Sequence, residues 1–417
     1  MGKVVFLIDD EEGHYLPTFA PANSLSSRGH ELVYLGIIDC EKSVRDAGFN
    51  FKCLATDIYP AGYKHQRRTR QIEGKPINKL CFFEKLNSEL RQFVSEFHPD
   101  IFVVSTFLSL DGLLIATALN VKVIIFTPYL LPDSFPRSEC WKAITSIFSN
   151  KKGNILQKTL SRYNLSADTP QAINDITLLL DQFFEIVACP DDFDPPFNSK
   201  RKNRFFIGPL VRERSNSEIV YIPPNKKLIY VSMGSQLARV KEKSIQLYTM
   251  LMQLMNDSDM DNYHLILSGG GINDLIPENK MPNVTIMNWA PQVSVLKQAA
   301  LMINHGGLGT IKECIMMGVP MIVIPDKYDQ PQNAQRITHH RLGIHLVFDD
   351  ISKTTLKQSI KSLIDNSDAS DSLRIMKSKF IEKENALKGE MLIEEEMRSL
   401  RKINLPGRKW WNNFFRR

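Results

Sequence analysis

The stretch that decides the fold runs from Trp289 to Asn333 and reads WAPQVSVLKQAALMINHGGLGTIKECIMMGVPMIVIPDKYDQPQN. It contains two short apolar runs, Leu301–Asn304 and Met321–Ile324, which are typical of buried strands. Between them, His305–Thr310 carries three glycines and opens a helical pattern. A glycine-rich turn at a helix start lets backbone N–H groups approach a phosphate, and the helix dipole adds attraction. We therefore predict an α/β unit with a phosphate-binding turn, where His305 donates a further hydrogen bond.

Other side chains around this turn suit a nucleotide sugar. Trp289 is expected in a loop after a strand, where its indole can stack on a base; a space-filling core tryptophan is the alternative. Glu313 lies eight residues beyond His305, where a carboxylate can accept hydrogen bonds from both ribose hydroxyls; an exposed helical residue is the alternative. Asp329 and Gln330 follow the second strand and offer acceptors and donors for a sugar.

Together these elements resemble the donor-binding signature of the family 1 UDP-glycosyltransferases, which include plant and animal enzymes and bacterial macrolide glycosyltransferases. The opening WAPQ, the HGG-x-G-T turn, Glu313, the GVP at Gly318–Pro320 and the Asp-Gln pair all match. HGGLGT replaces the plant HCGWNS, and the spacing before His305 is two residues shorter than in plants, which favours a bacterial or animal-like branch. The resemblance implies the GT-B fold, in which two Rossmann-like, doubly wound domains face each other across a cleft.

The resemblance also implies where the donor binds. Trp289, Ala290 and Gln292 would hold the base, Glu313 the ribose, and Asp329 with Gln330 the sugar. The diphosphate would lie against His305, Gly306, Gly307, Gly309 and Thr310. The run Val231–Ser235 resembles the family's second phosphate contact through Ser232 and Ser235, with a purely structural turn as the alternative.

Composition bounds the remaining possibilities. A chain of 417 residues predicts two domains of about 200 residues each. A net charge of +6 is too weak to indicate nucleic-acid binding. Six scattered cysteines without CxxC spacing indicate reduced thiols in a cytoplasmic protein instead of a disulfide framework or a zinc site. The first strand begins without a signal-peptide profile, and no run of 18 apolar residues predicts a membrane-spanning helix.

Apolar β-rich runs alternate with helical patterns along the chain, which predicts βαβ units and parallel sheets. The strands expected in the first half are Val4–Ile8, Leu32–Leu35, Ile101–Phe107, Val123–Phe126 and, as the last, Ile186–Pro190. Those expected in the second half are Leu228–Ser232, His264–Leu267, Val284–Met287, Leu301–Asn304, Met321–Ile324 and His345–Phe348. We predict an acceptor domain over 1–211, a linker over 212–227, and a donor domain over 228–371. In the GT-B fold that the resemblance implies, a helix over Ser372–Ile403 would cross back to the first domain and precede a basic aromatic tail that ends at 417.

Gly13-His14-Tyr15-Leu16-Pro17 follows the first strand, and loops at the carboxyl ends of parallel strands line the ligand crevice. An imidazole with an ordinary pKa near 6.5 can take a proton from an attacking hydroxyl. From the residues alone, a helix-capping or solvent-exposed histidine is the favoured interpretation. The family resemblance reverses this preference, because the GHxxP histidine is the family's catalytic base, and it assigns that role to His14.

In the family, an aspartate bonds this histidine and ends the strand that begins with Pro-Asp. That strand begins here at Pro99-Asp100, and Ser105 stands at the matching position. Ser105 can orient the ring of His14 but cannot stabilise its positive charge. Asp111 is one candidate substitute. The acidic run Asp9–Glu12 is another source of negative charge, although we favour a solvated loop for it.

Two surface features concern location. Lys64–Arg70 is expected to be a basic loop, and Arg408–Arg417 mixes aromatic residues with cations, which suits a membrane–water interface. A solvated loop and aromatic residues packed on the first domain are the alternatives. The acceptor is expected to contact Tyr129–Phe148, whose leucines, aromatics and prolines predict an apolar pocket.

The sequence therefore predicts an inverting, UDP-dependent hexosyltransferase that moves a sugar, with glucose favoured, to a hydroxyl of a small lipophilic acceptor. UDP-glucose would be a co-substrate, and no prosthetic group is expected. No metal is expected either, because no Asp-x-Asp pattern of the donor half presents itself for that purpose. The alternatives are a membrane-surface lipid glycosyltransferase and a non-catalytic nucleotide-sugar-binding partner protein, which Ser105 keeps open. We expect no nucleic-acid partner and a cytoplasmic location, with peripheral contact at the inner membrane surface through the tail as a further option.

Overall fold

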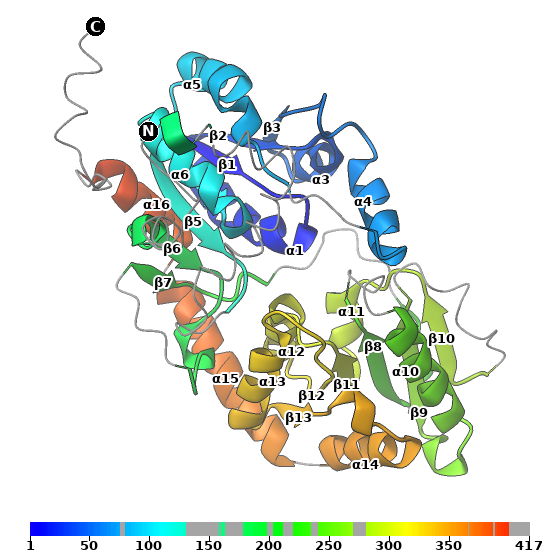
Figure 1. Cartoon of the computed structure of the whole chain (residues 1–417). Coiled ribbons are helices and arrows are strands. Elements are labelled where there is room, and N and C mark those ends of the chain that lie inside the picture. Colours follow the sequence, from blue (N-terminus) through cyan, green and yellow to red (C-terminus); the bar gives the residue numbers. More distant parts are fainter. Residues whose placement is uncertain are drawn as a thin grey trace, which may run out of the picture.

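The computed structural model describes residues 1–75, 80–130, 158, 160–162, 178–197, 203–211, 220–234, 241–269, 281–365, 367–386 and 388–399. Two parallel sheets with flanking helices make up this part of the chain (Figure 1). The first sheet has the strand order β3-β2-β1-β4-β5-β6-β7, and the second has the order β10-β9-β8-β11-β12-β13. The predicted pair of doubly wound α/β domains is confirmed.

The first domain contains the strands β1 Lys3–Leu7, β2 Glu31–Gly36, β3 Asn50–Cys53, β4 Ile101–Ser105, β5 Lys122–Thr127, β6 Phe184–Val187 and β7 Arg204–Phe206. Its helices include α1 Glu12–Tyr15, α2 Phe19–Ser27, α3 Glu41–Asp46, α4 Tyr63–Ile72, α5 Arg91–Phe97 and α6 Ser109–Ala118.

The second domain contains the strands β8 Lys227–Ser232, β9 Tyr263–Ser268, β10 Val284–Met287, β11 Ala299–Asn304, β12 Met321–Val323 and β13 Gly343–His345. Its helices include α10 Lys241–Leu254, α11 Gln292–Leu296, α12 Leu308–Met317, α13 Gln330–His339 and α14 Lys353–Ile364. Two further helices, α15 Ser367–Ala386 and α16 Gly389–Arg398, follow at the C-terminal end of the described chain.

Most central strands, and the edge strand β10, agree with the predictions within two residues. The edge strands β3, β7 and β13 do not. β3 and β7 are edge strands without a continuous apolar run, so the sequence pattern missed both. Because β7 follows β6, the expectation that Ile186–Pro190 is the last strand of the first sheet is wrong. The strand expected over His345–Phe348 is also wrong, since β13 ends at His345. The expected basic loop over Lys64–Arg70 is the helix α4.

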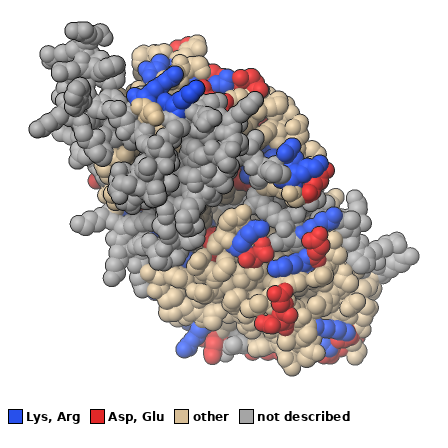
Figure 2. Space-filling view, in the orientation of Figure 1, with Lys and Arg blue, Asp and Glu red and all other residues tan. Residues whose placement is uncertain are grey.

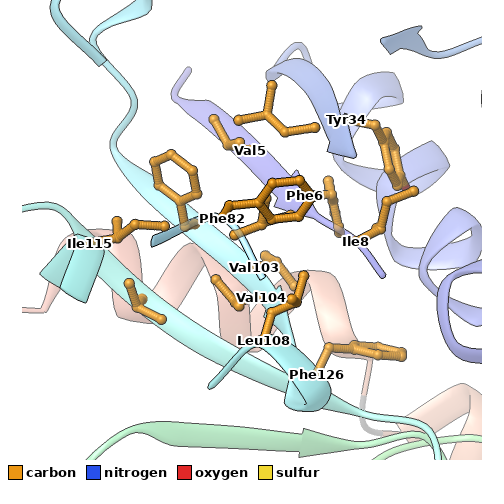
Figure 3. Packing of buried hydrophobic residues seen from close by; sticks show 14 of the residues in the cluster. Val5, Phe6, Ile8, Tyr34, Phe82, Val103, Val104, Leu108, Ile115 and Phe126 are labelled. Carbon is orange, nitrogen blue, oxygen red and sulfur yellow. The ribbon is translucent and has the colours of Figure 1, made fainter. Parts of the chain in front are cut away.

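The hydrophobic core around the first sheet explains why the central strands are continuous apolar runs in the sequence. Side chains of β1, β4 and β5 meet Tyr34 of β2 and Phe82, which lies ahead of α5 (Figure 3). Val5, Phe6 and Val104 are fully buried. Strands that are covered on both faces cannot alternate apolar with polar residues, so they lack the two-residue period of an exposed sheet.

Each sheet has a point where the strand order reverses. In the first sheet it lies between β1 and β4, where Leu7 pairs with Val104. In the second it lies between β8 and β11, where Ser232 pairs with Asn304. Ligands of open α/β sheets bind outside the carboxyl ends of strands at such reversal points. The chain therefore brings the loops after β1 and β4, and those after β8 and β11, to the two places where a ligand is expected.

The end of the described chain returns to the first domain (Figure 1). Instead of one helix over Ser372–Ile403, there are two helices, α15 and α16, with the break near Lys388. Ser24 of α2 donates a hydrogen bond to Glu390 of α16 at 2.8 Å. Lys122 of β5 donates to the backbone oxygens of Met397 and Ser399, at 2.5 and 2.6 Å. The domain boundaries at 211, 227 and 371 stay predictions.

Gly208 lies where the chain leaves the first sheet and touches α15. A Cβ atom at this position would lie 2.5 Å from the Cα of Glu384, and a helix backbone cannot move aside as a side chain can. We expect Gly208→Ala to lower the free energy of unfolding by about 1–3 kcal/mol, the usual cost of overpacking. Urea unfolding followed by circular dichroism measures this. Gly309→Ala is the control, because nothing lies within 4 Å of a Cβ there. Equal urea midpoints for the two variants would contradict the contact.

Candidate functional site

The end of β1 carries a histidine held by a carboxylate. His14 lies in the short helix α1, and its Nδ1 is 2.8 Å from Oδ1 of Asp9. The same carboxylate accepts the backbone N–H of Glu11 at 2.9 Å, and its Oδ2 accepts a short hydrogen bond from Ser105 Oγ. The ring of Phe107 stacks on the imidazole, with centroids 4.2 Å apart and planes 15° apart. Both strands at the reversal point therefore contribute residues to this group. His14 and Asp9 follow β1, and Ser105 ends β4.

The charges of this group favour the protonated imidazole. Burial lowers the pKa of His14, but the carboxylate of Asp9 raises it through charge and a hydrogen bond, with smaller contributions from Glu11 and Asp10, and the net shift is upward. Burial raises the pKa of Asp9, whereas His14 and then Ser105 lower it, and the net shift is downward. The pair therefore accepts a proton on the imidazole and keeps the negative charge on Asp9, which is the arrangement of a general base with an orienting carboxylate.

Three predictions about this group need correction. Asp9 and Asp10 are buried, so a solvated loop is wrong for these two residues of the acidic run. Asp111 is not the missing partner of His14, because its Oδ1 accepts the backbone N–H of Phe82 at 2.7 Å. Burial in that place raises the pKa of Asp111 to about 7. Ser105 acts on Asp9 and not on the ring.

Basic side chains of α4 neutralise the rest of the acidic run. The guanidinium of Arg67 bonds both oxygens of Asp10, and its Nη2 lies 3.6 Å from Glu11. Lys64 Nζ lies 3.5 Å from Glu12. On the face in Figure 2, described basic and acidic side chains likewise lie interspersed. The feature that the sequence suggested as a membrane-facing basic loop thus fixes the segment that carries His14.

The second domain holds another histidine in a tight cradle of glycines. A Cβ on Gly234 would lie 2.4 Å from Cε1 of His305, and a Cβ on Gly307 would lie 2.5 Å from its Nε2. Burial lowers the pKa of His305 to about 4, so the ring is neutral at physiological pH. Its Nδ1 is buried and has no hydrogen-bond partner within the described ranges. A neutral ring beside a helix start can donate one hydrogen bond to an anion.

The cradle predicts the effect of a single methyl group. Gly307 has φ −66°, which any residue adopts, so Gly307→Ala introduces only the collision with His305. We expect the variant to bind UDP about tenfold more weakly, since one lost hydrogen bond to a charged group costs about 1.5–3 kcal/mol. Isothermal titration calorimetry measures the affinity. The double variant Gly307→Ala/His305→Ala relieves the collision, so it should regain thermal stability without regaining UDP affinity. Unchanged affinity in Gly307→Ala would contradict the role of the ring.

The turn between β11 and α12 is built as the sequence predicted. Gly306 has φ +86°, a conformation that favours glycine, and its N–H donates to Asn304 Oδ1 at 2.8 Å. Gly307 is the N-cap of α12. Ser232 at the end of β8 accepts the N–H of Gly234 at 3.4 Å. The neighbouring Ser235 and most of the glycine run 269–271 lie outside the described residues.

The predicted base and ribose residues lie in one group. Trp289 is 57% exposed, so the alternative of a core tryptophan is wrong. Gln292 donates from Nε2 to Thr310 Oγ1 at 3.2 Å and, by a short hydrogen bond, to Glu313. Ala290 is buried, and its N–H donates to Ser268 Oγ at 3.4 Å. Elements that are separate in the chain, the loop after β10 and the start of α12, therefore present one polar surface beside an exposed indole.

The predicted sugar residues begin α13. Asp329 is the N-cap, and its Oδ2 accepts from Asn333 Nδ2 at 2.9 Å. Burial raises the pKa of Asp329 to about 6, against the lowering effect of the Asn333 hydrogen bond. Gln330 Oε1 accepts the backbone N–H groups of Asp326 and Lys327, so this oxygen holds the preceding turn. Arg336 and, to the smallest extent, His14 also lower the pKa of Asp329 through their positive charges.

Other sequence features have a structural role or lie outside the description. Asp257-Ser258-Asp259 does have the Asp-x-Asp pattern, and Lys353, Lys357 and Lys361 pair with its carboxylates. Within the described ranges, no group of three or more His, Cys, Asp or Glu side chains could hold a metal ion. No described helix is long and apolar enough to cross a membrane. The C-terminal tail, Cys140 and all but the first two residues of Tyr129–Phe148 are not described.

Comparisons with known proteins match this chain to glycosyltransferases. Residues 228–389 match the family model of the glycosyltransferase family 28 C-terminal domain. The chain is 26% identical to the NDP-glycosyltransferase YjiC of Bacillus subtilis over 357 residues, 84% of this chain and 86% of the relative. A glycosyltransferase of kitacinnamycin has a TM-score of 0.73 at 21% identity and covers 95% of this chain and 99% of its own. The calicheamicin glycosyltransferase CalG4 has a TM-score of 0.69 at 18% identity over 95% and 98%. The structural likeness confirms the predicted GT-B fold.

Proposed function

We propose a reaction on one premise, which is that this chain is a family 1 glycosyltransferase with the GT-B fold. The observation that carries the proposal is the paired geometry at the two reversal points. A histidine with a buried carboxylate partner lies on the first domain, and a neutral histidine in a glycine cradle lies on the second. The first suits a hydroxyl acceptor, and the second suits a diphosphate.

In the proposed reaction, His14 takes the proton of the acceptor hydroxyl at Nε2, because Nδ1 faces Asp9. The acceptor oxygen forms a bond to the anomeric carbon of the donor sugar as the bond from that carbon to the diphosphate oxygen breaks. UDP leaves from the opposite face with the electron pair of the broken bond, so the configuration inverts. Asp9 stabilises the imidazolium that forms, as an orienting carboxylate does in a catalytic triad.

The second domain stabilises the leaving group. His305, the N–H groups at the start of α12 and the helix dipole would face the charge that grows on the diphosphate. Glu313 and Gln292 would hold the ribose and base beside Trp289, and Asp329 the sugar hydroxyls. Bringing both reactants to fixed positions makes the attack effectively intramolecular, which is a large part of the rate enhancement such a site can supply.

The identities of the donor and the acceptor are more specific proposals. We infer a UDP-hexose, with glucose favoured, and a small lipophilic acceptor of the natural-product kind. The relatives' names support sugar transfer, and the Bacillus subtilis relative is named for an unspecified nucleotide. Phe107, which is 44% exposed, and Tyr129, whose ring centroid lies 5.2 Å away, offer an aromatic surface beside His14 for an apolar acceptor. The cytoplasmic location and the absence of a metal requirement stay predictions.

The observation that kept a binding-only protein open was the loss of the usual aspartate at Ser105. Asp9 supplies a carboxylate to the same imidazole, so that reason no longer applies. The membrane-surface alternative rested on the basic segment 64–70 and on the aromatic tail at 408–417. Lys64 and Arg67 of the segment pair with Glu12 and Asp10, and the tail lies outside the described residues. Neither alternative is favoured.

The test is nucleotide release from the purified protein across UDP- and dTDP-sugars, with a pool of phenols, sterols and hydroxylated carotenoids as acceptors. Acceptor-dependent UDP release, with a glycosylated product of inverted configuration by NMR, is the expected result. Release that is faster with dTDP-sugars would correct the donor and keep the reaction class. Nucleotide binding without turnover on any acceptor would overturn the proposed transferase in favour of a binding protein.

A further inference from the structure

A fully buried guanidinium joins the two domains. Arg336 lies on α13, and its side chain has no exposed surface. Its Nη2 donates to Oδ1 of Asp194 at 2.9 Å, and its Nε donates to the backbone oxygen of Asp194 at 3.2 Å. The guanidinium carbon lies 4.4 Å from the centroid of the Phe197 ring. Asp194 follows the turn after β6 in the first domain, so this ion pair spans sequence positions 142 residues apart.

The third donor of the same guanidinium faces the donor site. Arg336 Nη1 donates to Oδ1 of Asn333 at 3.1 Å. Guanidinium has no acceptor, so Asn333 must present its oxygen to Arg336 and its NH₂ group to the other side. That NH₂ group donates to the backbone oxygen of Gly306 and to Oδ2 of Asp329, both at 2.9 Å. Arg336 thereby fixes which way the amide of Asn333 points.

These contacts form one continuous chain of hydrogen bonds from the first domain to the donor site. The residues at 329, 333 and 336 recur at helical spacing, so they lie on one face of α13. The chain ends at the two groups that are proposed to meet the donor: the turn that faces the diphosphate and the carboxylate that faces the sugar. Among lesser effects, the charge of His14 lowers the pKa of Asp329, so the carboxylate at the end of the chain lies within electrostatic range of that histidine.

We propose that Arg336, hydrogen-bonded to Asp194, is a positioning residue that holds the donor sugar in line with His14, the catalytic base on the other domain. This inference rests on the proposed function. A buried ion pair is weak evidence for stability, because the cost of desolvating two charges offsets their attraction. The planar fork of arginine supplies several hydrogen bonds in a fixed geometry, which lysine cannot reproduce. Arg336 uses this geometry to hold Asp194 and Asn333 together.

Two variants test the contacts of Arg336 with Asp194 and Asn333, which we call the lock. A nearby ion pair provides the control. Arg336→Lys keeps the charge and removes the fork. The double variant Arg336→Met/Asp194→Leu removes both charges together, a replacement that buried ion pairs often tolerate. Lys383→Met is the matched control. Lys383 of α15 pairs with Asp191 at 2.8 Å, and both side chains of this pair are partly exposed, whereas the Arg336–Asp194 pair is buried.

Steady-state kinetics with the best donor, UDP titration by calorimetry and thermal unfolding are measured for each variant. We expect both lock variants to raise the donor KM about tenfold and to lower kcat about 10²-fold, the effect of roughly 1 Å of misplacement. The acid limb of the pH–rate profile, which reports His14, should not move. Lys383→Met should stay within about twofold of wild type in both constants.

The inference is overturned if either folded lock variant keeps donor KM and kcat within about twofold of wild type while it loses only thermal stability. If Arg336→Lys does not fold, the double variant decides. If neither folds, the pair is a requirement for the fold, which also overturns a specific role in positioning. A failure of the proposed function looks different, because wild type itself would then neither bind UDP nor turn over any donor.

Discussion

Replacing His14 by alanine is expected to lower acceptor-dependent UDP release about 10³-fold, which lies within the usual contribution of a general base. His14 lies on the first domain and the proposed nucleotide site on the second, so UDP affinity by calorimetry should stay within about twofold. His305→Ala is the matched variant for the other histidine. It should weaken UDP binding, since this ring faces the proposed diphosphate. Equal effects of the two variants on UDP affinity would contradict the division of roles between the domains.

Replacing Asp9 by asparagine is expected to lower kcat about 10²-fold, because the imidazolium that forms during the reaction loses its stabilising charge. The same change moves the acid limb of the pH–rate profile. Asp9 raises the pKa of His14, and the base must be unprotonated to act, so wild type loses activity as the pH falls through this raised value. Without the carboxylate the pKa of His14 falls, and the acid limb should therefore shift to lower pH.

Rates between pH 5 and 9, a range of about two units either side of neutrality, measure this shift. Ser105→Ala is the control, because Ser105 carries no charge and its hydroxyl bonds the Asp9 carboxylate and the backbone N–H of Phe107, so it should move the limb far less. The double variant Asp9→Asn/Ser105→Asp places the carboxylate where the family usually has it, and should recover part of the lost rate. A limb that stays fixed in Asp9→Asn would show that Asp9 does not act on His14.

Much of the fold was predictable because its strands are covered on both faces. Continuous apolar runs such as Val4–Ile8 and Leu301–Asn304 have that appearance only when two helix layers hide them. The edge strands β3 and β7 lack this signal, because they carry lysine, arginine or half-buried residues, and the sequence pattern missed both. The helix at 63–72 has no helical apolar pattern, because basic residues dominate it.

The donor half of the site was predictable because it is local. Trp289, His305, Glu313 and Asp329 fall within 45 residues, so their order and spacing already carry the arrangement. The base could be named from its place after the first strand. The sequence carries one signal for the partner of this base: Asp9 lies two residues beyond β1, at the carboxyl end of a strand beside the point where the sheet reverses.

By itself the sequence determined the two parallel sheets, the glycine-rich turn that opens α12 and the histidine that follows the first strand. Only the tertiary structure decided which carboxylate serves that histidine, since Asp9 is fixed by Ser105, 96 residues away on β4. It also decided that Arg336 and Asp194 join the domains across 142 residues of chain. Local pattern reports which face of an element is buried. Which distant polar groups meet there depends on strand order and on how the two domains dock, and no local pattern carries that information.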